Sequence, residues 1–186
     1  MENSEFELRL NKLLSEEREK LKSEYNRVLP TNELLFNRFD KAKYLNFGEN
    51  TSVYDSSIIM GDVEVGDNVW IGPYTLLEGL NGKLKIGNFV SIDTGVTIYT
   101  HDSTKYQVSG GVDSFEKGDV VIGDNTVIGT MSMIACGVHI GKHCVIGAHS
   151  FVKTDIEDNK IAAGCPAKVI GEVIINEDGS VSFVYY

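Results

Sequence analysis

The sequence has little of what marks secreted, membrane-spanning or nucleic-acid-binding proteins. It contains only three cysteines in 186 residues, an odd number without disulfide-scaffold spacing, so we expect a reduced, cytoplasmic protein. No apolar run approaches the ~20 residues that cross a bilayer, and the charged start does not resemble a signal peptide, so no membrane insertion is expected. The net charge of −10 argues against nucleic acid as a partner.

What the sequence does contain is an apolar residue that returns every six residues. Fifteen residues follow this period, and eight of them precede a glycine. They are Phe47, Val53, Ile59, Val65, Ile71, Leu77, Ile86, Ile92, Ile98, Ile122, Ile128, Ile134, Ile140, Ile146 and Val152. Six residues suit one short strand plus a corner, and three such units close a coil of about eighteen residues with the apolar side chains stacked inside.

We therefore predict an all-β solenoid, a parallel β-helix of about five coils within residues 47–170. Two interruptions break the period, with three extra residues after Leu77 and eighteen after Ile98. With three six-residue units in each coil, Leu77 and Ile98 fall on the same face of successive coils. Both insertions should therefore leave the solenoid at the same corner. Residues 101–120 then form a protruding loop, and loops on rigid scaffolds commonly carry function.

The two ends of the chain lack the period. Residues 1–46 show helical spacing of apolar residues, with a capping box at Ser4 and Glu7, and a second helix is expected near Thr31. Such helices would cover one blunt end of the solenoid. Residues 171–186 alternate apolar and polar side chains around an Asp-Gly pair, which predicts a β-hairpin.

Three stretches resemble a known family. "EYNRVLPTNELLFNRF" is similar to the helical start of maltose and galactoside O-acetyltransferases, and "GVTIYTHD" resembles the strand and loop that carry their catalytic histidine. "IAAGCPAKVI" resembles the family's closing Gly-x-Pro-Ala-Lys-x-Ile signature, and the loop with "SGG" is similar to acetyltransferases of O-antigen and capsule pathways. Resemblance to these hexapeptide-repeat acyltransferases implies a left-handed coil, a homotrimer with sites between subunits, acetyl-CoA as co-substrate and no metal.

The resemblance also implies catalytic roles. His101 would be the general base, since an imidazole can be neutral and basic at cell pH. Asp93 is the expected partner that orients it, by similarity to serine acetyltransferases, in which a similar Asp pairs with the catalytic His across the subunit interface, and Asp102 and Glu78 are rivals. Glu78, Asp102 and Tyr106 are also expected at the acceptor.

For the donor, the resemblance implies backbone amides along a cleft and cations near the nucleotide phosphates. A backbone N–H near Thr130 would also polarise the thioester carbonyl. The expected CoA-binding residues are Gly129, Thr130, Gly147, Ala148, Lys153 and Lys168.

These features predict an acetyl-CoA-dependent O-acetyltransferase acting on a sugar hydroxyl of a saccharide, nucleotide sugar or glycan, as in polysaccharide biosynthesis. An N-acetyltransferase for a nucleotide-linked amino sugar remains an alternative. A γ-carbonic-anhydrase-like zinc enzyme is disfavoured, because Thr130 and Ala135 stand where that class has histidine ligands. A non-catalytic β-helix is disfavoured by His101, the long loop and the closing signature.

Overall fold

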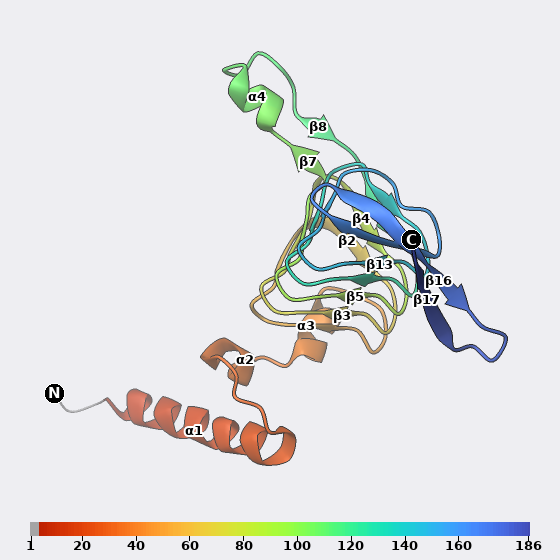
Figure 1. Ribbon diagram of the computed structural model, residues 1–186. Helices are drawn as coiled ribbons and strands as arrows, with labels where there is room; N and C mark the ends of the chain where they lie inside the picture. Colours follow the sequence, from red (N-terminus) through yellow and green to blue (C-terminus); the bar gives the residue numbers. More distant parts are fainter. Residues whose placement is uncertain (1–3) are drawn as a thin grey trace.

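The computed structural model describes residues 4–186, in which three helices precede a triangular rod of stacked coils (Figure 1). The helices are α1 (Glu5–Tyr25), α2 (Thr31–Leu35) and α3 (Arg38–Tyr44). The expected capping box is present, since the Ser4 side chain accepts from the Glu7 amide and Glu7 accepts from the Ser4 amide. The first three residues of the predicted 1–46 segment lie outside the described residues. No helix within residues 4–186 is both long and apolar enough to cross a bilayer.

The rod has three faces, and a coil typically contributes one short strand to each face. Strands of successive coils pair in parallel within a face. Face A contains β1 (Ser52–Val53), β3 (Trp70–Ile71), β5 (Ser91–Ile92), β10 (Val127–Ile128), β13 (Val145–Ile146) and β15 (Lys160–Gly164). Face B contains the first parts of β2 (Ile58–Val65) and β4 (Leu76–Ile86), then β6 (Thr97–Ile98), β11 (Met133–Ile134) and β14 (Phe151–Val152). Face C contains the last parts of β2 and β4, then β9 (Val120–Ile122) and β12 (His139–Ile140).

The interior of the rod is filled by the residues of the six-residue period. Ile71, Ile92, Ile98, Ile128 and Ile134 are all 0% exposed, and their stacked side chains form the core. Burying such apolar area is the main favourable term in folding. The predicted all-β solenoid, a left-handed parallel β-helix, is confirmed.

The rod has about six coils rather than the five expected, because face A carries a sixth strand, β15. Residues 127 and 145 pair across one full coil of 18 residues, whereas residues 145 and 161 pair across only 16. The chain after β14 is therefore two residues short of the period. Because of this shortening, a six-residue period read from the sequence does not include the sixth coil.

Both insertions leave the rod at the corner between faces B and C, as predicted. Leu77 pairs with Ile98, so the two interruptions follow the same face in successive coils. The first lengthens β4 around the corner. The second forms β7 (His101–Asp102), α4 (Thr104–Val108) and β8 (Glu116–Lys117), which stand away from the rod (Figure 1).

The C-terminal end extends face A with antiparallel strands. β16 (Ala167–Ile175) turns back along β15, and β17 (Val181–Tyr185) then pairs with β16. The predicted hairpin is present, and Gly179 adopts a φ of 82° in its turn, which glycine tolerates without strain. β16 begins earlier than the predicted tail, within the stretch "IAAGCPAKVI".

Candidate active site

His101 stands at the base of the protruding loop. β6 ends at Ile98, the next two residues turn the corner, and His101 then opens β7. The antiparallel pairing of β7 with β8 sets His101 opposite Lys117 and fixes the direction in which the loop leaves. The His101 side chain is 24% exposed, so it is held by the protein yet remains open to solvent.

The buried carboxylate of Glu78 is the hydrogen-bond partner of His101. The distance from Nδ1 of His101 to Oε2 of Glu78 is 3.0 Å, and the Glu78 side chain is 1% exposed. The carboxylate also accepts from the backbone N–H of Thr100 at 2.9 Å, from the Thr100 hydroxyl at 3.2 Å and from the amide of Leu80. Burial alone would raise the pKa of Glu78, but hydrogen bonds from Thr100, Leu80 and His101 outweigh it and lower the pKa.

This pairing decides which nitrogen of His101 can act as a base. An ionised carboxylate only accepts hydrogen bonds, so the Nδ1–H of His101 donates to Glu78. In the neutral ring the lone pair is then on Nε2, on the far side of the ring from Glu78. A proton taken up at Nε2 creates an imidazolium that already faces an anion, which is the arrangement of an oriented general base.

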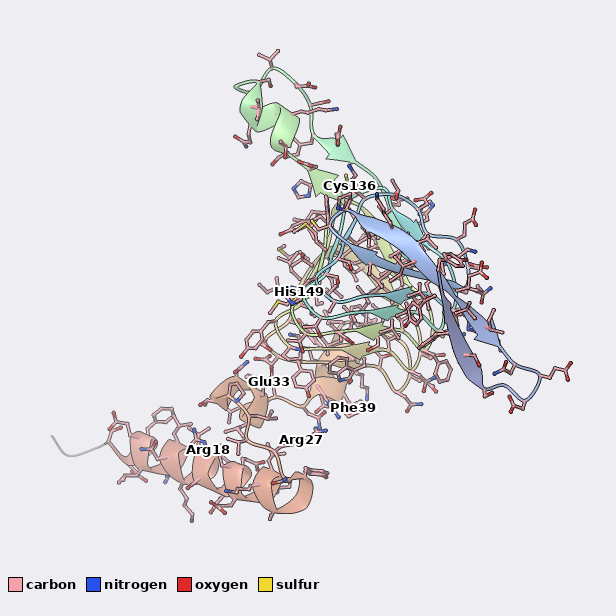
Figure 2. All side chains as sticks on the ribbon, viewed as in Figure 1. Arg18, Arg27, Glu33, Phe39, Cys136 and His149 are labelled. Atoms are coloured by element: carbon pink, nitrogen blue, oxygen red, sulfur yellow. The ribbon has the colours of Figure 1, made fainter. Side chains whose placement is uncertain are left out.

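His101 lines a hollow of about 240 Å³ beside the loop. The other lining residues are Tyr99, Asp102, Ser103, Met133, Ala135, Cys136 and Phe151. Figure 2 shows Cys136 near the base of the loop. Burial and nearby carboxylates raise the pKa of the Cys136 thiol, which does not favour the reactive thiolate.

Aromatic rings enclose the imidazole. The ring of Phe115 stacks on His101 with centroids 5.9 Å apart and an interplanar angle of 16°, and Tyr99 meets it edge-on at 6.3 Å. Tyr106 packs edge-on against Phe115 at 5.0 Å. Phe115 was not among the residues expected from the sequence.

Within one chain the hydrogen-bond partner of His101 is Glu78, one of the two expected rivals of Asp93. The pairing of His101 with Asp93 of a neighbouring subunit, which the resemblance implies, stays a prediction. Asp93 follows β5 at the corner between faces A and B, at the other end of face B from His101. Its carboxylate accepts from the Ser91 hydroxyl at 2.8 Å. Glu78 was also expected to touch the acceptor, but its side chain is 1% exposed and its oxygens accept from protein donors, among them His101.

The other two acceptor candidates lie on the loop. Asp102 is exposed and accepts from the Thr104 amide at 2.7 Å, just before α4 begins, and hydrogen bonds from Thr104 lower the pKa of Asp102. It lines the hollow directly. Tyr106 is 38% exposed and reaches the site through its contact with Phe115.

The expected CoA residues divide into two groups. Thr130 and Ala148 lie one coil apart at the corner between faces A and B, and within residues 4–186 neither amide has a hydrogen-bond acceptor. The amides of Gly129 and Gly147, in contrast, donate to carbonyls of the next coil at 2.8 Å, so they are not available to a ligand. Gly129 instead allows close approach, since a Cβ there would lie 2.7 Å from the Ala148 nitrogen.

Lys153 and Lys168 are both exposed near the last coil, and neither forms an ion pair in the described part of the chain. Among residues 4–186 no three His, Cys, Asp or Glu side chains cluster closely enough to hold a metal ion.

Comparison with known proteins identifies relatives with the same repeat. A family model described as "Bacterial transferase hexapeptide (six repeats)" matches residues 119–154. The chain is 30% identical over 131 residues to the carnitine operon protein CaiE of Escherichia coli, and the match covers 67% of this chain and 66% of CaiE. The chain thus spans about two thirds of the length of this curated relative.

Solved structures share the fold. A hexapeptide-repeat acetyltransferase of Vibrio cholerae, VCA0836, superposes with a TM-score of 0.59 at 23% identity, covering 88% of this chain and 92% of that one. AntD of Bacillus cereus, an N-acyltransferase solved with dTDP and 3-hydroxybutyryl-CoA, gives a TM-score of 0.59 at 23% identity, covering 73% and 89%. At this identity the likeness shows a common fold.

Proposed function

This chain belongs to the bacterial transferase hexapeptide family, as the sequence predicted, and on that premise we propose that it transfers an acetyl group from acetyl-CoA to a sugar hydroxyl. The observation that carries the proposal is the pair of Glu78 and His101, which leaves Nε2 as a base beside a hollow. We propose a cytoplasmic location on the same ground, because acetyl-CoA is a cytoplasmic metabolite.

In the proposed reaction, Nε2 of His101 removes the proton of the acceptor hydroxyl while the hydroxyl oxygen attacks the thioester carbonyl carbon. The new C–O bond forms, the C–S bond then breaks, and the leaving sulfur takes the proton back from Nε2. The products are the acetyl ester and the CoA thiol. Glu78 balances the charge of the intermediate imidazolium, and a general base of this kind typically contributes ~10²–10⁴-fold.

The donor would lie along the corner formed by Thr130 and Ala148 of a neighbouring subunit, because within one chain this corner and His101 stand at opposite ends of face B. Their amides have no other acceptor within residues 4–186 and would bind carbonyl groups of the pantetheine arm. Lys153 and Lys168, exposed near the last coil, would bind the phosphates at the nucleotide end.

We also propose that three copies associate through face B. The outward side chains of its strands are largely apolar, and Ile58 and Met133 are 53% and 42% exposed. The outward side chains of face C include exposed Glu64, Lys85 and His139, which suit contact with water. The hollow of about 240 Å³ is smaller than the ~300–1,000 Å³ of common ligand sites, so a neighbouring subunit would supply the remaining wall.

The test is release of CoA thiol from acetyl-CoA across a panel of sugars, nucleotide sugars and amino sugars. We expect one hydroxyl acceptor to give release, and His101→Ala to reduce kcat by more than about 100-fold. The matched control is His139→Ala, which removes an exposed imidazole from face C and should keep full activity. A His101→Ala enzyme that acetylates a hydroxyl at the wild-type rate would exclude His101 as the base.

N-Acylation is the second candidate, favoured by the fold shared with AntD, which is an N-acyltransferase solved with dTDP. A neutral amine is already nucleophilic and depends less on a base. Release with amino sugars alone, retained in His101→Ala, would support this candidate over the hydroxyl acceptor.

A further inference from the structure

We propose that Phe115 is a positioning residue for the general base, because its ring fixes the plane of the His101 imidazole. This inference rests on the proposed role of His101 and extends it to a residue of the protruding loop. If Phe115 orients His101, the loop acts on the proton-transfer step as well as on any contact with the acceptor.

One hydrogen bond is a weak constraint on an imidazole. The terminal torsion of a histidine side chain is broad, so a bond from Nδ1 to Glu78 still lets Nε2 swing through a range of positions. The Phe115 ring lies nearly parallel to the imidazole in an offset stack, with a centroid distance of 5.9 Å and an angle of 16°. Tyr99 meets the ring edge-on with an interplanar angle of 89°, so the imidazole is held by three contacts.

The loop is built to hold Phe115 at this place. The register of β7 with β8 sets Asp102 opposite Glu116, so residue 115 arrives next to the stem. Tyr106 supports the Phe115 ring at 5.0 Å, and Lys105 of α4 forms an ion pair with Glu116.

Exposure separates Phe115 from the other large apolar residues of the loop. Val108 and Val112 are 84% and 90% exposed, whereas Phe115 is half-buried against His101. The loop therefore packs Phe115 against the His101 ring, with Tyr106 behind it, and leaves its valines in solvent. A stacked ring also favours the imidazolium that forms when the proton is taken up, through the attraction of a cation to a π face.

Steady-state kinetics of Phe115→Ala, Phe115→Tyr and the control Val112→Ala test the inference. Loss of the stack should lower kcat roughly 10- to 100-fold with little change in KM, since small misplacements of a catalytic group cost that much. Phe115→Tyr keeps the ring and should restore kcat, and Val112→Ala should match the wild type. Equal kcat in Phe115→Ala, or a change in KM alone, would overturn the inference.

A second readout does not depend on activity. The ring protons of His101, assigned with His101→Ala, should carry a ring-current shift from Phe115 that disappears in Phe115→Ala and persists in Phe115→Tyr. Unchanged His101 resonances in Phe115→Ala would overturn the inference whatever the kinetics. If the wild-type protein releases no CoA thiol with any acceptor, the proposed function fails, and these resonances still decide the placement of the ring.

Discussion

At the residue scale, the pairing of Glu78 with His101 places an acid where the repeat most often has glycine. Residue 78 directly follows an inward-pointing leucine, and in eight other hexads that position is glycine. A buried carboxylate is costly unless several donors satisfy it, and here Thr100, Leu80 and His101 do so. The corner that holds the site therefore depends on the charge of Glu78.

Replacing this acid should change the acid sensitivity of the protein. Glu78→Gln should destabilise the fold by about 1–3 kcal/mol at pH 7, because an amide presents a donor to groups that need an acceptor. The pKa of Glu78 is lowered on folding, so its contribution is complete above the ordinary value of 4.5 and is lost as the pH falls below it.

Urea unfolding at fixed protein concentration, repeated at falling pH, checks this prediction. The difference between wild type and Glu78→Gln should be largest near neutral pH and should shrink below pH 4.5. A difference that stays constant down to strongly acidic pH would show that ionisation of Glu78 contributes nothing to stability.

The sequence contained a signal for Glu78 but none for Phe115. Because the period sets Leu77 beside Ile98, Glu78 must lie next to the turn that leads to His101. That its carboxylate accepts from His101 within one chain depends on the directions of the side chains, which the period does not give. Phe115 lies in a stretch without any repeat, and only the pairing of β7 with β8 brings it to the imidazole.

At the element scale, α2 and α3 close the first coil while α1 does not. Lys41 on α3 donates to the carbonyls of Tyr54, Asp55 and Ser57 at 3.0, 2.8 and 2.8 Å. Glu33 on α2 accepts from the amide of Asp55 at 3.0 Å, and Figure 2 shows it next to the rod. These contacts satisfy backbone groups at the open end of the first coil.

The helical spacing near the start predicted α1 correctly as a helix but not its packing. α1 has no buried residue, and it extends away from the rod (Figure 1). An amphipathic pattern shows that a helix has an apolar side, yet it does not show which surface covers that side. The cover expected from the whole 1–46 segment is provided in this chain by α2 and α3.

Removing the ammonium group of Lys41 should weaken the first coil. Lys41→Met keeps much of the side-chain volume but leaves three carbonyls without their donor, which should cost about 1–3 kcal/mol. Lys43→Met, on the exposed side of the same helix, should change stability by less than about 0.5 kcal/mol. Chemical denaturation of both variants is the measurement, and equal effects would refute a specific role for Lys41.

At the scale of the whole molecule, the three faces of the rod differ in what they present outward. The period predicted the faces and the shared corner of the insertions, since both follow from counting. It did not predict the sixth strand of face A, because the chain loses two residues after β14. The period also describes only inward-pointing residues, so it does not predict the outward side chains that decide whether subunits associate.

A charge on face B should prevent assembly. Ile58→Asp places a carboxylate on the apolar outer surface of β2, where burial between subunits would be costly, so the proposed trimer should dissociate. His139→Asp puts the same charge on face C and should leave the trimer intact. Light scattering should give the mass of three chains for the control and of one chain for Ile58→Asp, while an intact Ile58→Asp trimer would exclude face B.

The stem of the loop has a consequence for how such a protein can change over generations. β7 and β8 pair with each other and close the loop at its base. The strands of the rod before and after the loop therefore keep their register whatever the length of the loop. Residues 103–114 can therefore change in length or sequence without disturbing the inward side chains of the rod, while Tyr106 is the one residue among them that also supports Phe115. If the proposed function holds, such changes would alter the surface near the acceptor while the rod keeps His101 and the corner of Thr130 and Ala148 in place.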